Sequence, residues 1–491
     1  MEDVSKLTKI ARQVFASVDL NLIRPGFVYA NPGWTLQINM TRKEQCMKLF
    51  FMSLGCDKNL VDSEEMLGAL TERGFDITDD ETQADIIIIN TCCFIHDAKE
   101  ESIQAILEMA EFKKTGNCKA LIVTGCLAQR YQEEVTKEIP EVDAVLGTNS
   151  QEKILEAVEK ALGGETAHIF QPLTGIPNLS GKRVVTTGGS YEYLKIAEGC
   201  DKHCTYCIIP KIRGNYRSVP MEKLLRQAQE LAEQGVKELI LVAQETTLYG
   251  KDLYGEKSLH ILLKKLCEIS GLQWIRIMYC YPEEIYPELI ATIRDEKKIC
   301  HYLDLPIQHA SDKILKRMGR RTSKQQLIDI IEKLREEIPD IMLRTTLITG
   351  FPGETQEDHE ELMEFVNEME FERLGVFTYS PEEDTPAAEM EDQIAEEVKE
   401  ERRDELMELQ QEISLDNGQK LIGKTVTAMV EGKVADETAY VGRTYGDAPG
   451  VDGYIFINTG EMLMTGDFAR VKVTGALEYD LIGEIEDEYT K

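Results

Sequence analysis

Three cysteines in the stretch GCDKHCTYCIIP are spaced closely enough to bind one metal cluster. Cys200, Cys204 and Cys207 follow the pattern C-x-x-x-C-x-x-C. A cubane cluster has four irons, each usually bound by one cysteine, so three cysteines leave one iron open to another ligand. Zinc ligands typically come as C-x-x-C pairs, and a ferredoxin would supply a fourth cysteine nearby, which this stretch lacks. The spacing therefore favours an iron–sulfur cluster with one open position.

A second group of three cysteines lies nearer the N-terminus. Cys56 in SLGCDKN, Cys92 in NTCCF and Cys126 in VTGCLAQ each follow a strand-like run. The carboxyl ends of parallel strands meet at one edge of a sheet, where such sheets bind ligands. Isolated free cysteines often only pack as small hydrophobic residues. Three of them at one edge instead predict a second site with metal-binding chemistry.

Two α/β regions must position these cysteines. From Met47 to Gly163, apolar runs such as ADIIIIN and KALIVTG alternate with helical stretches such as SEEMLGALTERG, which predicts a doubly wound parallel sheet. From Tyr191 to about Asp384, runs such as KELILVAQ and DIMLRTTLITGF recur at the intervals of βα units. This second pattern predicts a full or partial βα barrel.

The remaining segments complete a predicted organisation of five parts. Short β-prone runs after Leu421 indicate a small all-β, OB-like barrel. Met47 precedes a strand-like run and is the expected functional start, with the preceding residues an extension. The predicted parts are an N-terminal extension (1–46), a parallel-sheet domain (47–163), a linker rich in Gly, Pro, Thr and Ser (164–189), a βα barrel with a long exit helix (190–420) and the small β barrel (421–491).

The charge balance bears on the partner. The chain has 55 basic and 88 acidic residues, a net charge of -33, which would repel a polyphosphate backbone. The last 71 residues contain six basic and thirteen acidic residues, a sign that argues against an RNA-binding barrel. The acidity either serves solubility alone or complements a basic protein partner. No direct nucleic-acid substrate is expected.

The compartment is inferred from cysteine usage and from patterns that the sequence lacks. No run of eighteen apolar residues and no secretory signal pattern occurs, so we expect a cytoplasmic protein without a membrane span. Twelve cysteines in that compartment are poor candidates for disulfides. Six of them lie outside both groups. Apart from Cys93, which adjoins Cys92, they are interpreted as packing residues: Cys46, Cys118, Cys267, Cys280 and Cys300.

The cysteine motif GCDKHCTYCIIP resembles the radical S-adenosylmethionine (SAM) superfamily, in which SAM chelates the open iron. The whole layout from Met47 onward is similar to the methylthiotransferase family, which joins an N-terminal cluster domain, a radical SAM barrel and a C-terminal TRAM domain. The resemblance implies two 4Fe–4S clusters, the second of which is held by the N-terminal cysteines and carries or delivers sulfur. It assigns Cys92 of NTC as a ligand and leaves Cys93 as a bystander.

Within that family, the motifs favour one of two branches. SLGCDKNLVDSE, LDLPIQHASDKILKRMGR and VGRTYGDAPGVDGYIFIN resemble the branch that methylthiolates the β-carbon of an aspartate in small-subunit ribosomal protein uS12. The resemblance implies SAM as radical source and methyl donor, and an electron donor of unknown identity. The alternatives are the branch that modifies a tRNA adenosine and a non-enzymatic iron–sulfur carrier. Ribosomal proteins are basic, so the acidic charge agrees with the uS12 branch.

Four residues are expected to contact SAM. Gln244 and Glu245 end the strand KELILVAQE, where radical SAM proteins usually contact the methionine amino group. Arg213 and Arg217 follow the cysteine motif and either hold SAM or face solvent. The predicted contacts are Tyr206, Gln244, Glu245 and Arg344.

Overall fold

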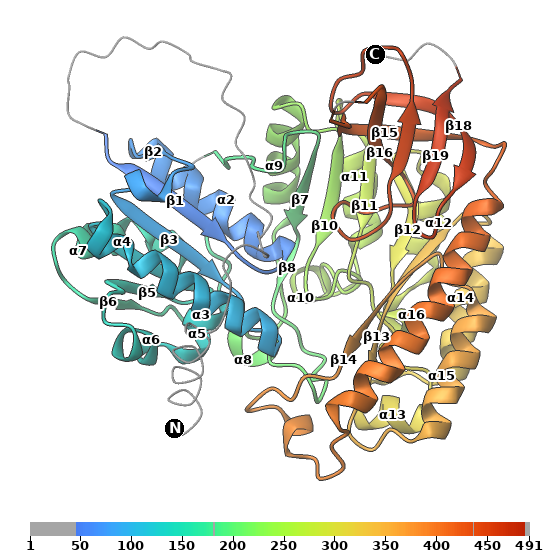
Figure 1. Ribbon diagram of the computed structural model, residues 1–491, viewed down its shortest axis with the longest axis horizontal. Coiled ribbons are helices and arrows are strands. Elements are labelled where there is room, and N and C mark those ends of the chain that lie inside the picture. The colour runs from blue at the N-terminus through green and yellow to red at the C-terminus, as the bar shows by residue number, and fades with distance from the viewer. Residues whose placement is uncertain (1–45, 180–181, 436, 487–491) are drawn as a thin grey trace. The chain divides into compact units, whose positions relative to one another are not determined.

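A computed structural model describes residues 46–179, 182–435 and 437–486 of the chain (Figure 1). Except for Cys46, the predicted N-terminal extension lies outside these residues. The chain forms two compact units. The first comprises the chain up to Gly188 together with Lys211–Gly214, and the second comprises Gly189–Pro210 and the chain from Asn215 onward.

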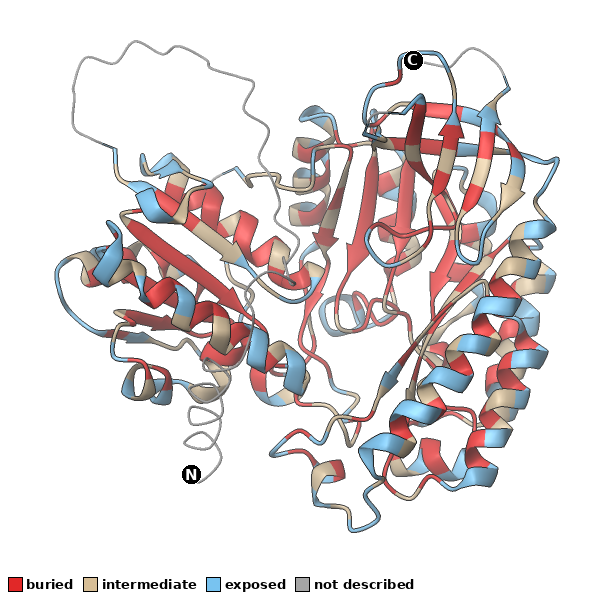
Figure 2. Ribbon diagram, in the orientation of Figure 1, coloured by how far each residue is buried: buried red, intermediate tan, exposed pale blue. Residues whose placement is uncertain are grey.

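The first unit is built on a six-stranded parallel sheet with the strand order β2-β1-β3-β4-β5-β6. In this doubly wound arrangement the strand order reverses between β1 and β3. Both faces of the sheet are covered, so β3 and β4 are buried along their whole length. Figure 2 shows this for β3. The strands are β1 (Lys48–Ser53), β2 (Asp76–Ile77), β3 (Ile86–Thr91), β4 (Ala120–Gly125), β5 (Ala144–Leu146) and β6 (Ala167–Ile169).

Helices cover both faces of this sheet. On one face, apolar residues of α2 and α7 such as Met66 and Val158 share a core with Ile88 and Ile122 of the sheet. Helix α3 packs against β3 and β4. The helices of the unit are α2 (Asp57–Glu72), α3 (His96–Ala110), α4 (Phe112–Thr115), α5 (Cys126–Tyr131), α6 (Glu133–Glu138) and α7 (Ile154–Leu162), with 3₁₀ helices η1 (Glu81–Gln83) and η2 (Gln151–Lys153).

The segment predicted as a linker, residues 164–189, contains structure of its own. It supplies β6, which pairs with β5, and Arg183, whose Nε donates to Glu64 Oε2 of α2 at 2.7 Å. The backbone N–H of Thr186 donates to Glu64 Oε1 at 2.7 Å. A strand of three residues is too short for an alternating pattern to reveal, so the sequence indicated only a loose segment.

The second unit contains a six-stranded parallel sheet whose strands are neighbours in chain order. Strands β7 and β14 are its edges, so the sheet is a partial βα barrel. Helix α16 (Glu396–Gln419) leaves this barrel and packs against β14 and α15. The strands are β7 (Tyr191–Lys195), β10 (Glu238–Val242), β11 (Trp274–Ile277), β12 (Ile299–Asp304), β13 (Met342–Thr349) and β14 (Arg373–Thr378).

Helices separate the strands of this partial barrel. The longer ones are α9 (Met221–Glu233), α11 (Leu259–Cys267), α12 (Pro287–Asp295), α14 (Lys324–Glu337) and α15 (Gln356–Met369). Short elements are α10 (Lys251–Tyr254), α13 (Asp312–Arg317), η3 (Pro282–Glu284), η4 (Pro386–Glu389) and the antiparallel pair β8 (Ala197–Glu198) and β9 (Arg217–Ser218). Helix α8 (Ile209–Arg213) begins in this unit, and its last three residues belong to the first unit. Within the described ranges, no helix is long and apolar enough to cross a membrane.

The C-terminal strands form a closed barrel that is fixed to the partial barrel by buried contacts. Arg443 Nη2 and Arg276 Nε each lie 2.7 Å from Glu238, the first residue of β10, and all three side chains are fully buried. Trp274 meets Phe468 edge to face at 4.8 Å. Removing one partner of such an ion pair costs about 3–5 kcal/mol. The strands, in the order β15-β16-β17-β19-β18, are β15 (Thr425–Lys433), β16 (Ala439–Thr444), β17 (Ile455–Asn458), β18 (Phe468–Ala476) and β19 (Leu481–Ile485).

Candidate functional site

Cys200, Cys204 and Cys207, called the loop trio below, lie on one loop of the second unit. Cys200 and Cys204 are buried and Cys207 is partly exposed. The backbone N–H of Cys207 donates to the Cys204 carbonyl at 3.0 Å. Burial raises the pKa of Cys200 to about 12, and the neighbouring Cys204 thiol adds to the rise. Thiols buried this close together become thiolates when they bind a cation such as iron.

Aromatic residues surround the loop trio. The Tyr281 hydroxyl lies 3.8 Å from Cys204 Sγ, and the Arg320 guanidinium lies 4.3 Å from the centre of the Tyr281 ring. Tyr206 meets Phe351 edge to face at 6.5 Å. Tyr206 thus stands in the apolar surroundings of the cysteines, and its predicted contact with SAM stays a prediction.

Gln244 and Glu245, just beyond the carboxyl end of β10, present buried oxygen atoms without hydrogen-bond donors. Within the described residues, neither Gln244 Oε1 nor Glu245 Oε2 has a hydrogen-bond partner, although Lys202 Nζ lies 3.9 Å from the latter. Burial raises the pKa of Glu245 to about 7. Buried acceptors in this state are costly unless a donor reaches them. An ammonium group such as that of SAM would supply the missing donors, so these residues fit the predicted cofactor.

Arg344 is engaged elsewhere. Its Nη1 lies 2.8 Å from Asp304 and its Nε lies 3.3 Å from Asp452, in the loop between β16 and β17. The guanidinium therefore joins the partial barrel to the C-terminal barrel. The predicted contact of Arg344 with SAM stays a prediction. The sequence placed Arg344 on the right strand but did not reveal which groups face it.

Cys56, Cys92 and Cys126, called the edge trio below, lie at the carboxyl edge of the first unit's sheet. Cys56 caps the N-terminus of α2 after β1, Cys92 follows β3, and Cys126 is the first residue of α5 after β4. Burial raises the pKa of Cys92 to about 12, and the nearby thiols of Cys126 and Cys56 raise it further. The trio therefore occupies one place, where the strand order reverses between β1 and β3.

Glycines before two of these cysteines bring the loops together. Gly55 has a φ of +88°, and a Cβ on it would lie 2.8 Å from Cys92 Sγ. Gly125 has a φ of +92°, and a Cβ on it would lie 2.2 Å from Asn90 Oδ1. Of the amino acids, only glycine adopts this backbone conformation readily and has no side chain to fill the missing space. The dipeptide Gly-Cys in SLGCDKN and VTGCLAQ is the sequence signal of this close packing.

The resemblance implies a four-iron cluster on the edge trio and not a single ion. Within the described residues, no three His, Cys, Asp or Glu side chains lie close enough to hold a single metal ion. A four-iron cluster takes each thiolate on a different iron, so its ligands lie farther apart than those of one ion. The contact of Gly55 with Cys92 favours Cys92 over the fully buried Cys93 as a ligand.

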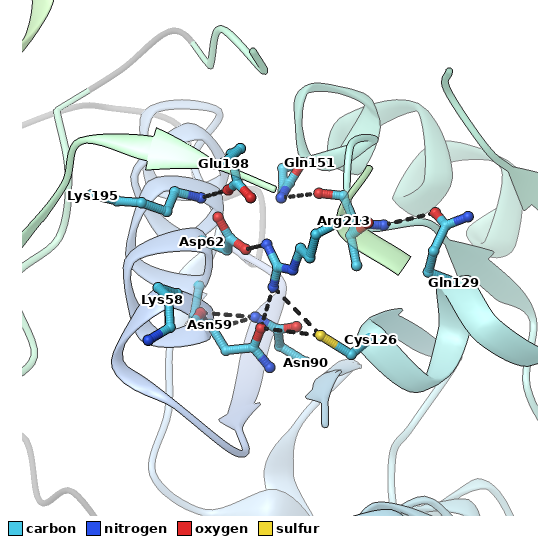
Figure 3. A network of polar contacts seen from close by, with 12 residues as sticks. Lys58, Asn59, Asp62, Asn90, Cys126, Gln129, Gln151, Lys195, Glu198 and Arg213 are labelled. Atoms are coloured by element: carbon cyan, nitrogen blue, oxygen red, sulfur yellow. Dashed lines mark hydrogen bonds and ion pairs between the residues drawn. The ribbon is translucent and has the colours of Figure 1, made fainter. Parts of the chain in front are cut away.

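Two residues that the sequence did not single out as ligand neighbours contact Cys126 of the edge trio (Figure 3). Asn59 Nδ2 donates to the carbonyls of Leu54 and Thr91, at 3.0 Å each, and its Oδ1 lies 3.8 Å from Cys126 Sγ. Arg213 Nη2 lies 3.6 Å from the same sulfur. Arg213 belongs to the first unit. It is only 2% exposed, so the predicted alternative in which it faces solvent is wrong. The position of Asn59, one helical turn after Cys56, was the available signal.

Three family models match the chain. They are an uncharacterized protein family named UPF0004 at residues 48–147, the radical SAM superfamily at residues 194–366 and the TRAM domain at residues 422–485. The first match spans the edge trio and the second spans the loop trio. The third coincides with the closed β barrel.

Similar curated proteins are ribosomal protein uS12 methylthiotransferases named RimO. The protein of Lachnoclostridium phytofermentans is 64% identical over 440 residues, which cover 90% of this chain and 100% of the relative. That of Clostridium botulinum is 51% identical, with 91% and 99% covered. That of Acetivibrio thermocellus is 50% identical, with 90% and 99% covered. These relatives align along nearly their entire length.

A solved structure shares the fold at low sequence identity. It is the radical SAM methyltransferase TsrM from Kitasatospora setae, with a TM-score of 0.50 and 12% identity over 80% of this chain and 79% of that chain. At that identity the likeness concerns the fold alone.

Proposed function

The chain belongs to the family of ribosomal protein uS12 methylthiotransferases, RimO, and on that premise we propose that it methylthiolates the β-carbon of one aspartate in uS12. The observation that carries the proposal is the presence of two cysteine trios, each gathered at one place in its own unit. A carrier of clusters has no need of the buried acceptors Gln244 and Glu245 beside β10. We therefore propose that the chain is an enzyme with SAM as cofactor and not a carrier of clusters.

The loop trio would hold the cluster that binds SAM, and the edge trio would hold the second 4Fe–4S cluster. When bound, these cofactors supply radical formation, sulfur and the methyl group, which the unactivated C–H bond of an aspartate β-carbon requires because no side-chain base can deprotonate it at neutral pH. Gln244 Oε1 and Glu245 Oε2 would accept hydrogen bonds from the SAM ammonium group. Tyr281, whose hydroxyl lies 3.8 Å from Cys204 Sγ, would line this site together with Tyr206.

The charge of the chain supports a basic protein as the substrate. The net charge of -33 attracts ribosomal proteins and repels tRNA. In the C-terminal barrel, Arg443 is fully buried between Glu238 and Glu431 and therefore cannot bind phosphate. We propose that uS12 is recognised without a direct nucleic-acid contact, in the cytoplasm, with electrons from a separate donor.

The test is the mass of uS12 from cells with and without this gene. We expect an increment of about 46 Da, the mass of a methylthio group replacing hydrogen, on one aspartate of uS12 only when the gene is present. Mass analysis of tRNA nucleosides from the same cells is the matched control. A methylthio group lost from a tRNA adenosine, with uS12 unchanged, would transfer the proposal to the tRNA branch.

A further inference from the structure

Arg213 makes a forked contact beside the edge trio (Figure 3). Its Nη1 donates to Asp62 Oδ2 at 2.8 Å, and its Nη2 donates to Asn59 Oδ1 and lies 3.6 Å from Cys126 Sγ. All four side chains are buried. The segment that carries Arg213 is fixed by Thr148, whose Oγ1 donates to the Ile212 carbonyl at 2.6 Å. The guanidinium thus reaches the sulfur from a segment that is hydrogen-bonded to Thr148.

The chemistry of Cys126 makes this contact more important once the thiol is deprotonated. As a thiol, Cys126 can donate to Asn59 Oδ1. An iron-bound thiolate has no hydrogen to donate and only accepts. Arg213 has five N–H donors and always carries a positive charge, so it can donate to the thiolate and to Asn59 together. A hydrogen bond between charged groups is about twice as strong as a neutral one.

We propose that Arg213 is the positioning residue of the second cluster, holding the Cys126 thiolate and raising the reduction potential of that cluster. The proposal rests on the proposed function, because it requires a cluster on the edge trio. Hydrogen bonds to ligand sulfurs and nearby positive charge stabilise the reduced, more negative cluster. Asp62 orients the fork, so that one nitrogen faces the carboxylate and the other faces the sulfur.

The experiment uses the full chain with the loop trio replaced by alanine, so that only the second cluster remains. Iron content and the reduction potential, followed by electron paramagnetic resonance, are measured for this parent and for three further variants of it. Arg213→Gln removes the charge, and Arg213→Lys keeps the charge but has one nitrogen that cannot reach Asp62 and Cys126 together. Arg73→Gln is the matched control, because Arg73 is exposed and paired with Glu159 at 3.4 Å.

We expect all variants to retain one cluster, with the potential of Arg213→Gln shifted to more negative values, that of Arg213→Lys in between and that of Arg73→Gln unchanged. A loaded Arg213→Gln variant with the parent's potential overturns the inference and leaves the proposed function standing. A parent without iron overturns the cluster assignment itself. Should Arg213→Gln fail to fold, Arg213→Lys decides: a lowered potential supports the inference and an unchanged potential overturns it.

Discussion

The two cysteine trios are built in opposite ways. The loop trio lies within eight consecutive residues, and its turn is closed by a backbone hydrogen bond from Cys207 to Cys204. The edge trio comes from three separate segments that directly follow β1, β3 and β4. Its members meet because the strands are parallel and because Gly55 and Gly125 allow close approach. One site is therefore a property of a short stretch of sequence and the other of a folded sheet.

This difference predicts that the edge trio depends more on neighbouring residues than the loop trio does. A local loop needs few contacts to bring its ligands together, whereas an assembled site needs residues that tie its loops to one another. Asn59 has that role for the edge trio, since it donates to the loop before Cys56 and to the last residue of β3, just before Cys92. The loop trio should consequently tolerate changes around it better.

The largest expected effect comes from replacing either trio with alanine. Each replacement should abolish methylthiolation of uS12, because both clusters are needed, and should leave about half of the iron, that of the other cluster. Iron analysis and peptide mass measurement of uS12 check this. A chain without the edge trio that keeps all of its iron would refute the second site.

Replacing Asn59 with alanine should destabilise the first unit, which holds the edge trio, and leave the loop trio unaffected. The carbonyls of Leu54 and Thr91 would lose their side-chain donor inside the protein, which we expect to lower the free energy of unfolding of the first unit by about 4 kcal/mol. Denaturant unfolding followed by circular dichroism measures this, and iron on the loop trio should persist. Asn117→Ala, at an exposed residue with one hydrogen bond to Thr82, is the control. Equal losses in both variants would contradict the central role of Asn59.

Glu245 should make the stability of the second unit depend on pH. Its pKa is raised to about 7 from 4.5, so between these values the folded chain binds more protons than the unfolded chain, and stability falls as pH rises. The full effect is about 3 kcal/mol. Glu245→Gln should therefore gain stability relative to the parent between about pH 5 and about pH 8 in the absence of SAM. Thermal unfolding at both pH values checks this, and Glu156→Gln, at a half-buried glutamate paired with Lys160, is the control. Parallel pH curves for Glu245→Gln and the parent would exclude the buried-acid interpretation.

The smallest expected effect is that of Tyr281→Phe, which removes a hydroxyl 3.8 Å from Cys204 Sγ. A weak contact of this length should contribute less than about 1 kcal/mol. In a chain whose edge trio is replaced by alanine, the remaining cluster should keep its iron and nearly its reduction potential. A shift as large as that of Arg213→Gln would show that the loop trio depends on its surroundings as much as the edge trio does.

The sequence predicted most of the fold because local patterns suffice for it. The α/β class with its parallel-sheet domain, partial barrel and C-terminal barrel is confirmed. The continuous run of isoleucines in β3 reflects burial on both faces. The positions of the cysteines after strands also followed from the pattern, and their assignment as ligands stays a prediction.

What the sequence could not reveal depends on partners distant along the chain. Arg344 meets Asp452 of the C-terminal barrel, and Arg213 meets Asp62 of α2, more than a hundred residues away in each case. An arginine in a motif has no local feature that tells a cofactor contact from a buried ion pair. The short strand β6 was missed for a related reason, because its pairing with β5 and not its own pattern defines it.

The placement of Lys211–Gly214 in the first unit has a consequence for recombination between related genes. The chain crosses between the units three times, at Gly188, Pro210 and Gly214. Recombination that exchanged only the N-terminal half between related genes would therefore separate Asn59 and Asp62 from their own Arg213. The two halves of this protein are not independent modules. An exchange must include this four-residue segment to keep the surroundings of the edge trio intact.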